Sequence, residues 1–322
     1  MVRIGTWNLE NLFRPEDEAG PGDPVAYEAK LTALAEAIVR MAPDVLAVQE
    51  VGNPDALADL AERAGGGWHC VTAGVEPGQR PIRVGYLSRL PLTDVAEVTR
   101  FPPELRPIQV DDDGTRLAVM GRPALRARVE VGGQPIDLIT CHLKSKLLSF
   151  PPGPDGRPRF DTGDEGERAR VAVYALSRRA AEAATVRAAA TDVLDGQGRH
   201  RRLVVCGDLN DVPEAATTQI LSGPPGSEIG TDGFDQPDRG DGQRLWNLAP
   251  RIPEQQRFSR RYRGRGELID HILVSDALVH HVADGDVRTD AAGPTPSISD
   301  DPGPRRNAAG SDHRPVIAQF DI

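Results

Sequence analysis

Short apolar segments that end abruptly in polar clusters recur along this chain of 322 residues. In the middle of the chain, the apolar segment 203–206 runs directly into the sequence Gly-Asp-Leu-Asn at 207–210. Because successive side chains along a strand point to opposite faces, Asp208 and Asn210 point the same way. A carboxylate and an amide oxygen side by side can hold a hard cation together with a phosphate oxygen. The pattern therefore predicts a buried strand with a candidate cation or phosphate site at its end.

The rest of the chain predicts strands that alternate with helices. Apolar residues recur at helical spacing over 27–42, 55–64 and 165–195. The last of these helices places four apolar residues on one face: Val173, Leu176, Ala180 and Ala184. Strands are predicted over 3–8, 45–48, 83–88, 125–131, 136–141, 203–206, 268–274 and 315–320. Two glycines at 132–133 join two strands in a hairpin, so part of the sheet is antiparallel.

These elements predict one domain over residues 1–322, with an α/β (α+β) fold. Two mixed sheets are expected to pack face to face, with helices outside. Four segments rich in Pro, Gly and Asp are predicted to be surface loops: 14–26, 150–165, 222–243 and 289–310. Cys141 and Cys206 lie inside apolar strands, which favours reduced thiols in the core.

Five further polar clusters accompany the one at 207–210. The first strand ends in Trp-Asn-Leu-Glu-Asn at 7–11, and the second ends at Glu50. Asn8 alone could be a turn residue, and Glu50 alone a solvated surface group. His142 opens the sequence His-Leu-Lys-Ser-Lys and stands beside Lys144 and Lys146, two of only three lysines. A lone histidine is more often structural, but this grouping favours a grip on phosphate.

Two clusters lie late in the chain. Asp270 interrupts an apolar strand, and a buried carboxylate is costly unless it is paired, so we expect Asp270 to have a partner. His271 faces the other way and is predicted to be structural. Asp312 and His313 open the final strand, where they could serve as a metal ligand and a general base, or merely as the polar cap of a turn.

Taken together, the six clusters resemble the endonuclease/exonuclease/phosphatase superfamily. This group includes deoxyribonuclease-I-like nucleases, abasic-site endonucleases, inositol polyphosphate 5-phosphatases and neutral sphingomyelinases. The clusters occur in the family's order, from Trp-Asn-Leu-Glu-Asn at 7–11 to Ser-Asp-His-Arg-Pro at 311–315. Each motif alone is weak, whereas six in order are specific. The resemblance implies a four-layer α/β/β/α sandwich and Mg²⁺- or Mn²⁺-dependent hydrolysis of a phosphoester.

The resemblance also implies roles for particular residues. Glu50 looks like the principal metal ligand, with Asn8 and Asp312 close by. Asp208 and Asn210 look like the residues that orient the attacking water and the scissile phosphate.

Two histidines and an arginine complete the implied site. His313 looks like the general base or a phosphate-contacting histidine, oriented by Asp270. His142 looks placed to stabilise the transition state or to assist the leaving group. Arg122 resembles an arginine that some members place upstream of the hairpin, although a surface arginine would look the same. Many members place a phosphate-contacting tyrosine near 80–88, but Tyr86 lies in a core-like stretch and receives no role.

The substrate is suggested by one basic stretch at 257–265. It carries Arg260, Arg261 and Arg263, interleaved with Phe258 and Tyr262, which suits contacts with nucleic-acid phosphates and bases. A solvated loop that offsets nearby acids would look similar. The form His-Leu-Lys-Ser-Lys also resembles bacterial nuclease-like members. We therefore expect a nuclease that acts on DNA rather than RNA.

The overall charge leaves an alternative open. The net charge of −10 disfavours non-specific binding to DNA. It does not exclude a phosphodiesterase, because a bound metal can supply positive charge at the active site. A phosphatase or phosphodiesterase for a small or lipid-derived phosphoester is the main alternative, and an inactive binding module is a second. No apolar run reaches the roughly 20 residues of a membrane helix. The start of the chain reads as a strand rather than a signal peptide, so we expect a cytoplasmic monomer.

Overall fold

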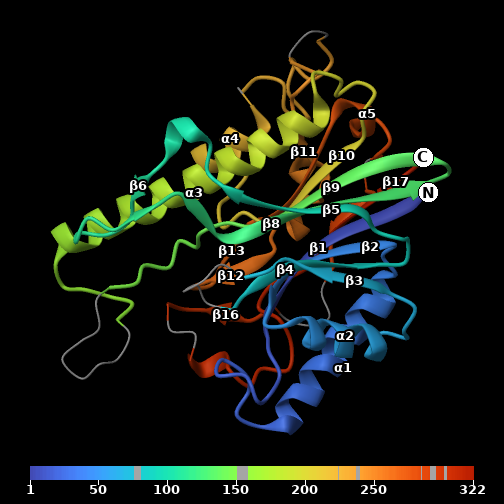
Figure 1. The fold of residues 1–322 in the computed structure, drawn as a ribbon. Helices are drawn as coiled ribbons and strands as arrows, with labels where there is room; N and C mark the ends of the chain where they lie inside the picture. The colour runs from blue at the N-terminus through green and yellow to red at the C-terminus, as the bar shows by residue number, and fades with distance from the viewer. Residues whose placement is uncertain are drawn as a thin grey trace.

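The computed structural model is a sandwich of two sheets with helices on both outer faces (Figure 1). It describes residues 1–75, 81–150, 159–223, 225–236, 240–283, 285–290, 295–300 and 303–322. Half of the predicted loop at 150–165 therefore lies outside the described residues, as do parts of the loops at 222–243 and 289–310. The described architecture is the four-layer α/β/β/α sandwich with mixed sheets that the sequence predicted.

The first sheet has six strands and a parallel pair at its centre. In spatial order they are β15 (Val287–Thr289), β17 (Val316–Phe320), β1 (Val2–Leu12), β2 (Val45–Val51), β4 (Arg83–Ser88) and β3 (His69–Thr72). β1 and β2 run parallel and are joined by α1 (Pro24–Met41). The other neighbours are antiparallel.

The second sheet repeats this plan. In spatial order its strands are β11 (Trp246–Asn247), β14 (Asp270–Val274), β10 (Leu203–Asp208), β9 (Gln134–His142), β8 (Val119–Val131) and β5 (Thr93–Arg100). β9 and β10 run parallel and are joined by the long helix α3 (Glu165–Leu194). β8 and β9 form the predicted hairpin. Each sheet therefore has a β–α–β unit at its centre, because parallel neighbours need such a crossover connection.

The other elements are short. The helices are α2 (Pro54–Arg63), α4 (Ala216–Ser222), α5 (Asp276–Val279) and the 3₁₀ turns η1 (Pro103–Leu105), η2 (Ala249–Arg251), η3 (Glu254–Gln256) and η4 (Gly303–Arg305). One small sheet has three strands: β13 (Arg265–Glu267), β12 (Arg260–Tyr262) and β16 (Ser297–Ile298). A second has two: β6 (Ile108–Gln109) and β7 (Arg116–Leu117). None of the described helices combines the length and apolar character that a membrane span requires.

Three hydrophobic clusters fill the three spaces between the four layers. Val45 and Leu138 belong to the cluster between the sheets. Leu46 turns to the opposite face and packs under α1 and α2, whereas Ile139 turns outward beneath α3. The change of face between adjacent residues is the strand alternation that the sequence displays. Tyr86 lies fully within the central cluster and donates a hydrogen bond to the carbonyl of Leu125 (3.1 Å), which confirms its place in the core.

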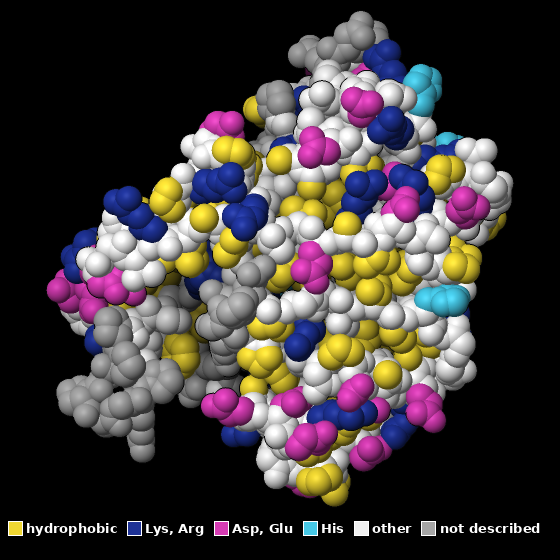
Figure 2. Space-filling view, viewed as in Figure 1, with side chains coloured by type: hydrophobic (Ala, Val, Ile, Leu, Met, Phe, Trp, Pro, Cys, Tyr) yellow, Lys and Arg dark blue, Asp and Glu magenta, His cyan; other side chains and the backbone are white. Residues whose placement is uncertain are grey.

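Only part of the predicted apolar face of the long helix is covered, because Ala180 and Ala184 are half-buried whereas the first two residues of the face are exposed. Val173 is 58% exposed and Leu176 is 47% exposed. The amino-terminal half of α3 projects past the sheet, and hydrophobic and basic side chains alternate along its visible surface (Figures 1 and 2). The side that packs on the sheet instead includes Ala183, Val186 and Ala190, together with two buried charged residues, Arg179 and Glu182. Helical spacing located the helix correctly but did not identify its buried face.

Candidate active site

The polar ends of the central strands meet at one edge of the sandwich. The carboxyl ends of β1 and β2 lie together, as do those of β9 and β10. β17 and β14 are antiparallel to these strands, so their amino ends reach the same edge. The amide nitrogen of Asn8 lies 3.0 Å from Oδ2 of Asp208 and so joins the two sheets. The edge gathers Asn8, Glu50, His142, Asp208, Asn210, Asp270, Asp312 and His313.

Asn8 is the central hydrogen-bonding group of this edge. Its Nδ2 donates to Oε1 of Glu50 (3.1 Å) as well as to Asp208. Its Oδ1 accepts from the backbone N–H of Glu10 (2.9 Å). The second oxygen of Glu50 accepts from the backbone N–H of Asn11 (2.9 Å). The bend that ends β1 therefore fixes both the Asn8 amide and the Glu50 carboxylate.

Several residues at this edge have left-handed backbone conformations although they are not glycine. The φ angles are 51° at Glu10, 55° at Asn11, 61° at Glu50 and 53° at Asn210. Such conformations are uncommon outside glycine and cluster at functional sites. They turn backbone N–H groups toward the side chains of the site, as where the N–H of Asn210 donates to Oδ1 of Asp208 (2.9 Å).

Gly207 brings β10 close to β9 at this point. Its φ is 147°, and a Cβ at residue 207 would lie 2.0 Å from the carbonyl oxygen of Cys141. No side chain fits there, so the glycine ahead of Asp208 is required by the approach of the two strands.

His313 and Asp270 form a buried pair. Nδ1 of His313 lies 2.7 Å from Oδ2 of Asp270, and Asp270 has no exposed surface. This confirms that the carboxylate inside the apolar strand has a partner. Burial lowers the pKa of His313, but the Asp270, Asp312 and Asp208 carboxylates outweigh it and raise that pKa to about 10. Nε2 of His313 lies 4.0 Å from Asp208 and 4.0 Å from Asp312, so it faces the acidic cluster.

The other histidine has the opposite electrostatic environment. Nε2 of His142 lies 3.4 Å from Oδ2 of Asp208. Burial, followed by the charges of Arg122 and His313, holds the pKa of His142 well below its usual value. Burial and the neighbouring Asp270 raise the pKa of Asp208 to about 6. The two histidines therefore flank one carboxylate, and without a bound cation one is neutral and the other charged near pH 7.

The donor set fits a hard divalent cation. Within the described residues, four carboxylates of the edge form no ion pair with lysine or arginine: Glu50, Asp208, Asp270 and Asp312. Ligand atoms of Asp208, Asp270 and His313 lie within 4.8 Å of one another. Glu50 and Asp312 lie at the same edge, 3.9 Å from His142 and 4.0 Å from His313, and their carboxylates could also hold a cation. Oxygen ligands of this kind suit Mg²⁺ or Mn²⁺.

The predicted phosphate contacts Arg122 and Lys144 lie beside the edge but face the backbone. Arg122 donates to the carbonyls of His142 (3.2 Å) and Leu143 (3.1 Å). The Lys144 ammonium donates to the carbonyls of Ser145 (3.1 Å) and Leu147 (3.0 Å). In this structure, both residues support the loop that follows His142.

The basic stretch forms a small hairpin, β12–β13, next to the site. Arg260 pairs its backbone with His313 and its guanidinium with Glu267 (3.0 Å). Arg261 stacks over the Phe258 ring at 4.4 Å. Arg263 bonds to Asp300 (2.6 Å) at the exposed tip of the hairpin. Each of these arginines therefore has a partner within the protein.

His271 is structural, as predicted. Its Nε2 lies 2.8 Å from the carbonyl of Asp211, and its Nδ1 lies 3.1 Å from the Asn247 amide.

Two residues of α3 were missed by the motif analysis. Glu182 and Arg179 are buried, and both bond to the segments that carry the site. The signal in the sequence is faint: Glu182 is the lone charged residue within the stretch 180–186, which is otherwise Ala, Thr and Val.

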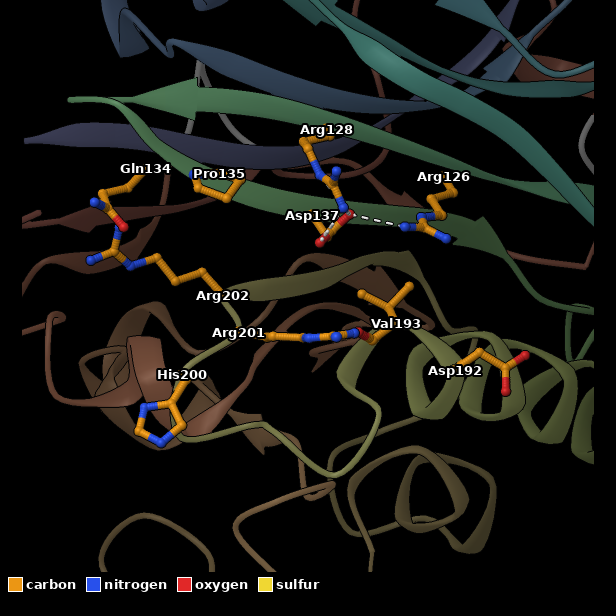
Figure 3. A pocket seen from close by; sticks show the side chains of 10 residues that line it. All are labelled: Arg126, Arg128, Gln134, Pro135, Asp137, Asp192, Val193, His200, Arg201 and Arg202. Carbon is orange, nitrogen blue, oxygen red and sulfur yellow. Dashed lines mark hydrogen bonds and ion pairs between the residues drawn. The ribbon is translucent and has the colours of Figure 1, made fainter.

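A separate hollow of about 390 Å³ lies at the opposite end of the second sheet. Figure 3 shows four arginines around it, two from β8 and two from the loop before β10. Arg126 and Arg128 bond to Asp137, at 3.2 Å and 3.0 Å from its Oδ1, and Arg201 bonds to the carbonyl of Val193 (2.7 Å). None of the residues that line this hollow belongs to the polar clusters of the sequence.

The fold and the polar edge together define a hydrolase of the deoxyribonuclease-I-like class. Residues 5–313 match the model of the endonuclease/exonuclease/phosphatase family. The chain belongs to this family. No curated protein is similar enough in sequence to count as a relative.

Solved structures share the fold at low sequence identity. A 3′ phosphatase, NExo, from Neisseria bound to a product DNA hairpin is 22% identical, with a TM-score of 0.53 and all of both chains covered. TDP2 from C. elegans is 14% identical, with a TM-score of 0.57, covering 100% of this chain and 75% of that one. An AP endonuclease from Archaeoglobus fulgidus is 18% identical, with a TM-score of 0.54 and all of both chains covered.

Proposed function

We propose that this protein is a metal-dependent phosphoester hydrolase that cleaves phosphodiester bonds of nucleic acid. The observation that carries the proposal is the buried edge where four carboxylates and two histidines converge without a lysine or arginine counter-ion among the described residues. His313 is a single cation among four carboxylates. Buried negative charges that are not fully balanced are costly unless a ligand completes them. A divalent cation and a phosphate group would complete this set together.

The cation is proposed to be Mg²⁺ or Mn²⁺, held by Glu50 and Asp312 with Asn8 nearby. When bound, it would neutralise charge on the phosphoryl oxygens and on the leaving oxygen. Removing the Glu50 carboxylate should therefore weaken both cation binding and turnover.

The remaining side chains are proposed to act on water and phosphate. Asp208 and Asn210 orient the attacking water and the scissile phosphate. His313, held by Asp270, contacts the phosphate as a charged donor, whereas only its neutral form would take the proton of the water. Hydrogen-bond donors fixed in place before the reaction stabilise charge that develops on phosphoryl oxygens.

His142 supplies a further donor beside Asp208 and is proposed to stabilise the transition state or to assist the leaving group. Arg122 and Lys144 are proposed to contribute positive charge behind it. Residues 1–322 are proposed to form a single catalytic domain, which the match over residues 5–313 supports.

DNA is proposed as the substrate rather than RNA, with the β12–β13 hairpin as a contact surface. Arg260, Arg261 and Arg263 lie on this hairpin beside His313, with the Phe258 and Tyr262 rings between them. Aromatic and arginine side chains together suit stacking on bases and contacts with phosphates. The DNA hairpin named for the Neisseria 3′ phosphatase structure is consistent with this choice.

A substrate panel tests the proposal. Purified protein would be incubated with plasmid DNA, single-stranded DNA, RNA, a 3′-phosphorylated oligonucleotide, inositol phosphates and bis-p-nitrophenyl phosphate. Each substrate would be tested with Mg²⁺, with Mn²⁺ and with EDTA. We expect metal-dependent cleavage of DNA that EDTA abolishes, and the variant His313→Ala prepared in parallel controls for contaminating nucleases. Absence of metal-dependent turnover on every substrate would refute the proposal and favour an inactive binding module.

The alternative is a phosphatase or phosphodiesterase for a small or lipid-derived phosphoester. The net charge of −10 favours it, because an acidic surface repels long polyanions. Hydrolysis of inositol phosphates or of the 3′-phosphate, with intact DNA left uncut, would select this alternative.

We also propose that the protein is a cytoplasmic monomer. Cys141 and Cys206 are buried free thiols, which is consistent with a reducing compartment. Size-exclusion chromatography with light scattering would test the monomer, because a dimer would elute at twice the mass of 34.7 kDa.

A further inference from the structure

The segments that carry the site are tied to one another through two buried charged residues of α3. Glu182 is 2% exposed and Arg179 is 6% exposed. We refer to these two residues as the α3 clamp. Both lie on the face of α3 that packs against the second sheet. An apolar side chain at either position would cost less desolvation free energy on folding.

Glu182 bonds to two site segments at once. Its Oε1 accepts from the backbone N–H of Gly121 (3.1 Å), the residue before Arg122. Its Oε2 accepts from the backbone N–H of Lys144 (2.6 Å), two residues after His142. Arg178, one turn earlier on α3, bonds to Oε1 at 3.1 Å and balances the charge.

Gly121 makes this arrangement possible. A Cβ at residue 121 would lie 1.5 Å from an Nη atom of Arg178. The guanidinium therefore occupies the space that a side chain would fill, and the backbone of β8 can approach the Glu182 carboxylate. Gly121 and Glu182 are thus parts of one contact.

Arg179 ties the same loop to the end of β10. Its Nη1 donates to the carbonyl of Lys144 (3.1 Å) and its Nε donates to Oδ2 of Asp211 (3.3 Å). Asp211 directly follows Asn210, whose amide nitrogen donates to the carbonyl of Leu143 (3.0 Å). Residues 143 and 144 are therefore held from both sides.

We infer that Glu182 and Arg179 are positioning residues for the reaction: they fix the His142–Lys144 loop, the Arg122 segment and the end of β10 relative to one another. The inference rests on the proposed function, because it concerns the same site. Both act through other residues: Glu182 through the backbone of Gly121 and Lys144, and Arg179 through the Lys144 carbonyl and the Asp211 carboxylate. Small displacements of catalytic groups cost about a hundredfold in rate per ångström.

The test compares Glu182→Gln with a matched control, Asp137→Asn. Both replace a buried carboxylate that bonds to arginine on the α3-facing side of the second sheet, but Asp137 lies at the end remote from the site. In Glu182→Gln, the new side-chain amide would keep one acceptor oxygen and turn a donor toward one backbone N–H. We expect Glu182→Gln to lower kcat about ten- to a hundredfold with little change in KM. Asp137→Asn should leave kcat unchanged at a comparable shift in Tm.

Hydrogen exchange supplies a readout that does not depend on turnover. Peptides that cover 119–123 and 142–146 should exchange faster in Glu182→Gln, and peptides that cover 142–146 and 209–213 should exchange faster in Arg179→Lys. None of these peptides should change in Asp137→Asn. Unchanged exchange in those peptides, or an equal loss of kcat in Asp137→Asn, would overturn the inference. If the wild-type protein cleaved no phosphoester, the proposed function would fail, and the exchange data would still decide whether the α3 clamp holds the loop.

Discussion

The two ends of the second sheet differ in how their charges are compensated. At the carboxyl ends of β9 and β10, Asp208 lies among other carboxylates and forms no ion pair with lysine or arginine within the described part of the chain. At the amino end of β9, Asp137 is enclosed by Arg126 and Arg128. The same sheet therefore carries acids without an arginine or lysine partner at one end, where His313 is the neighbouring cation, and an acid with two arginine partners at the other.

This difference separates structural charge from charge that awaits a ligand. A buried carboxylate with arginine partners needs nothing further, although it adds little net stability. A buried group of carboxylates with one histidine cation is not fully balanced, and burial, then the neighbouring Asp270, raise the pKa of Asp208 to about 6. Charges that are not fully balanced in a well-packed fold point to a functional site.

The largest expected effect is on turnover at the end that carries Asp208. Asp208→Asn should lower kcat at least about a hundredfold, because the residue would no longer orient the water and phosphate. Stability should change little, because removal of the buried charge is favourable but the new amide turns a donor toward Asn8 or toward the N–H of Asn210. Steady-state kinetics would measure kcat, and thermal unfolding would measure stability. Near wild-type turnover would show that Asp208 is not needed for the reaction.

His313→Ala should also lower kcat about a hundredfold. Unlike the first variant, it should lower stability as well, because Asp270 would be left buried without its partner. The double variant His313→Ala/Asp270→Asn should lose no more activity than the single one if the two residues act as a unit. Fully additive losses would show that Asp270 acts independently of His313.

At the paired end, the same kind of substitution should have the opposite consequence. Asp137→Asn should leave kcat unchanged and lower the free energy of unfolding by about 1–3 kcal/mol, because Arg126 and Arg128 keep one acceptor oxygen but lose the negative charge that balances them. Chemical denaturation would measure the change. A large loss of activity in Asp137→Asn would show that the charges at this end are not merely structural.

A smaller effect is expected at the β12–β13 hairpin. Arg261→Gln/Arg263→Gln should raise KM on DNA several-fold and reduce the salt dependence of binding by about two counterions. Arg260 is left in place, because its bond to Glu267 supports the hairpin. Unchanged KM and salt dependence would show that this surface does not contact DNA.

The smallest effect is on the pH dependence at Lys144. Burial, then the charges of Arg178 and Arg122, lower the pKa of Lys144 to about 8. Its positive charge is therefore present below about pH 8 and lost above it. We expect KM to rise a few-fold between pH 7 and pH 9, and Lys144→Arg to remove that rise, because arginine stays charged. A KM that is constant across this range would argue that the charge of Lys144 does not contribute to substrate binding.

Much of the fold was predictable because its signals are local. The central strands and the three main helices follow from the spacing of apolar residues, and the hairpin at β8–β9 follows from two glycines. The pairing of Asp270 was predictable from the cost of burying a carboxylate in an apolar strand. The identity of the partner, His313, depends on strands that are distant in sequence and came only from the family resemblance.

Other features depend on tertiary contacts that leave no local pattern. β5 was missed because its residues are mostly exposed at the sheet edge and show no alternation. The buried face of α3 was misjudged because the helix is rich in alanine on every side and half of it projects past the sheet. Glu182 was missed because its importance comes from backbone groups of β8 and of the loop after β9, which no motif records.

The left-handed residues at the polar edge have a consequence for how this chain can evolve. Each such residue costs about 1 kcal/mol relative to a relaxed backbone, and glycine would avoid most of that cost. At Glu50 and Asn210, however, glycine would also delete a side chain of the site. Asn11 is different, since it is exposed and contributes only its backbone N–H to Glu50. Selection for thermal stability could therefore replace residue 11 by glycine without loss of a site side chain. At residues 50 and 210, the same substitution would gain stability only at the expense of activity.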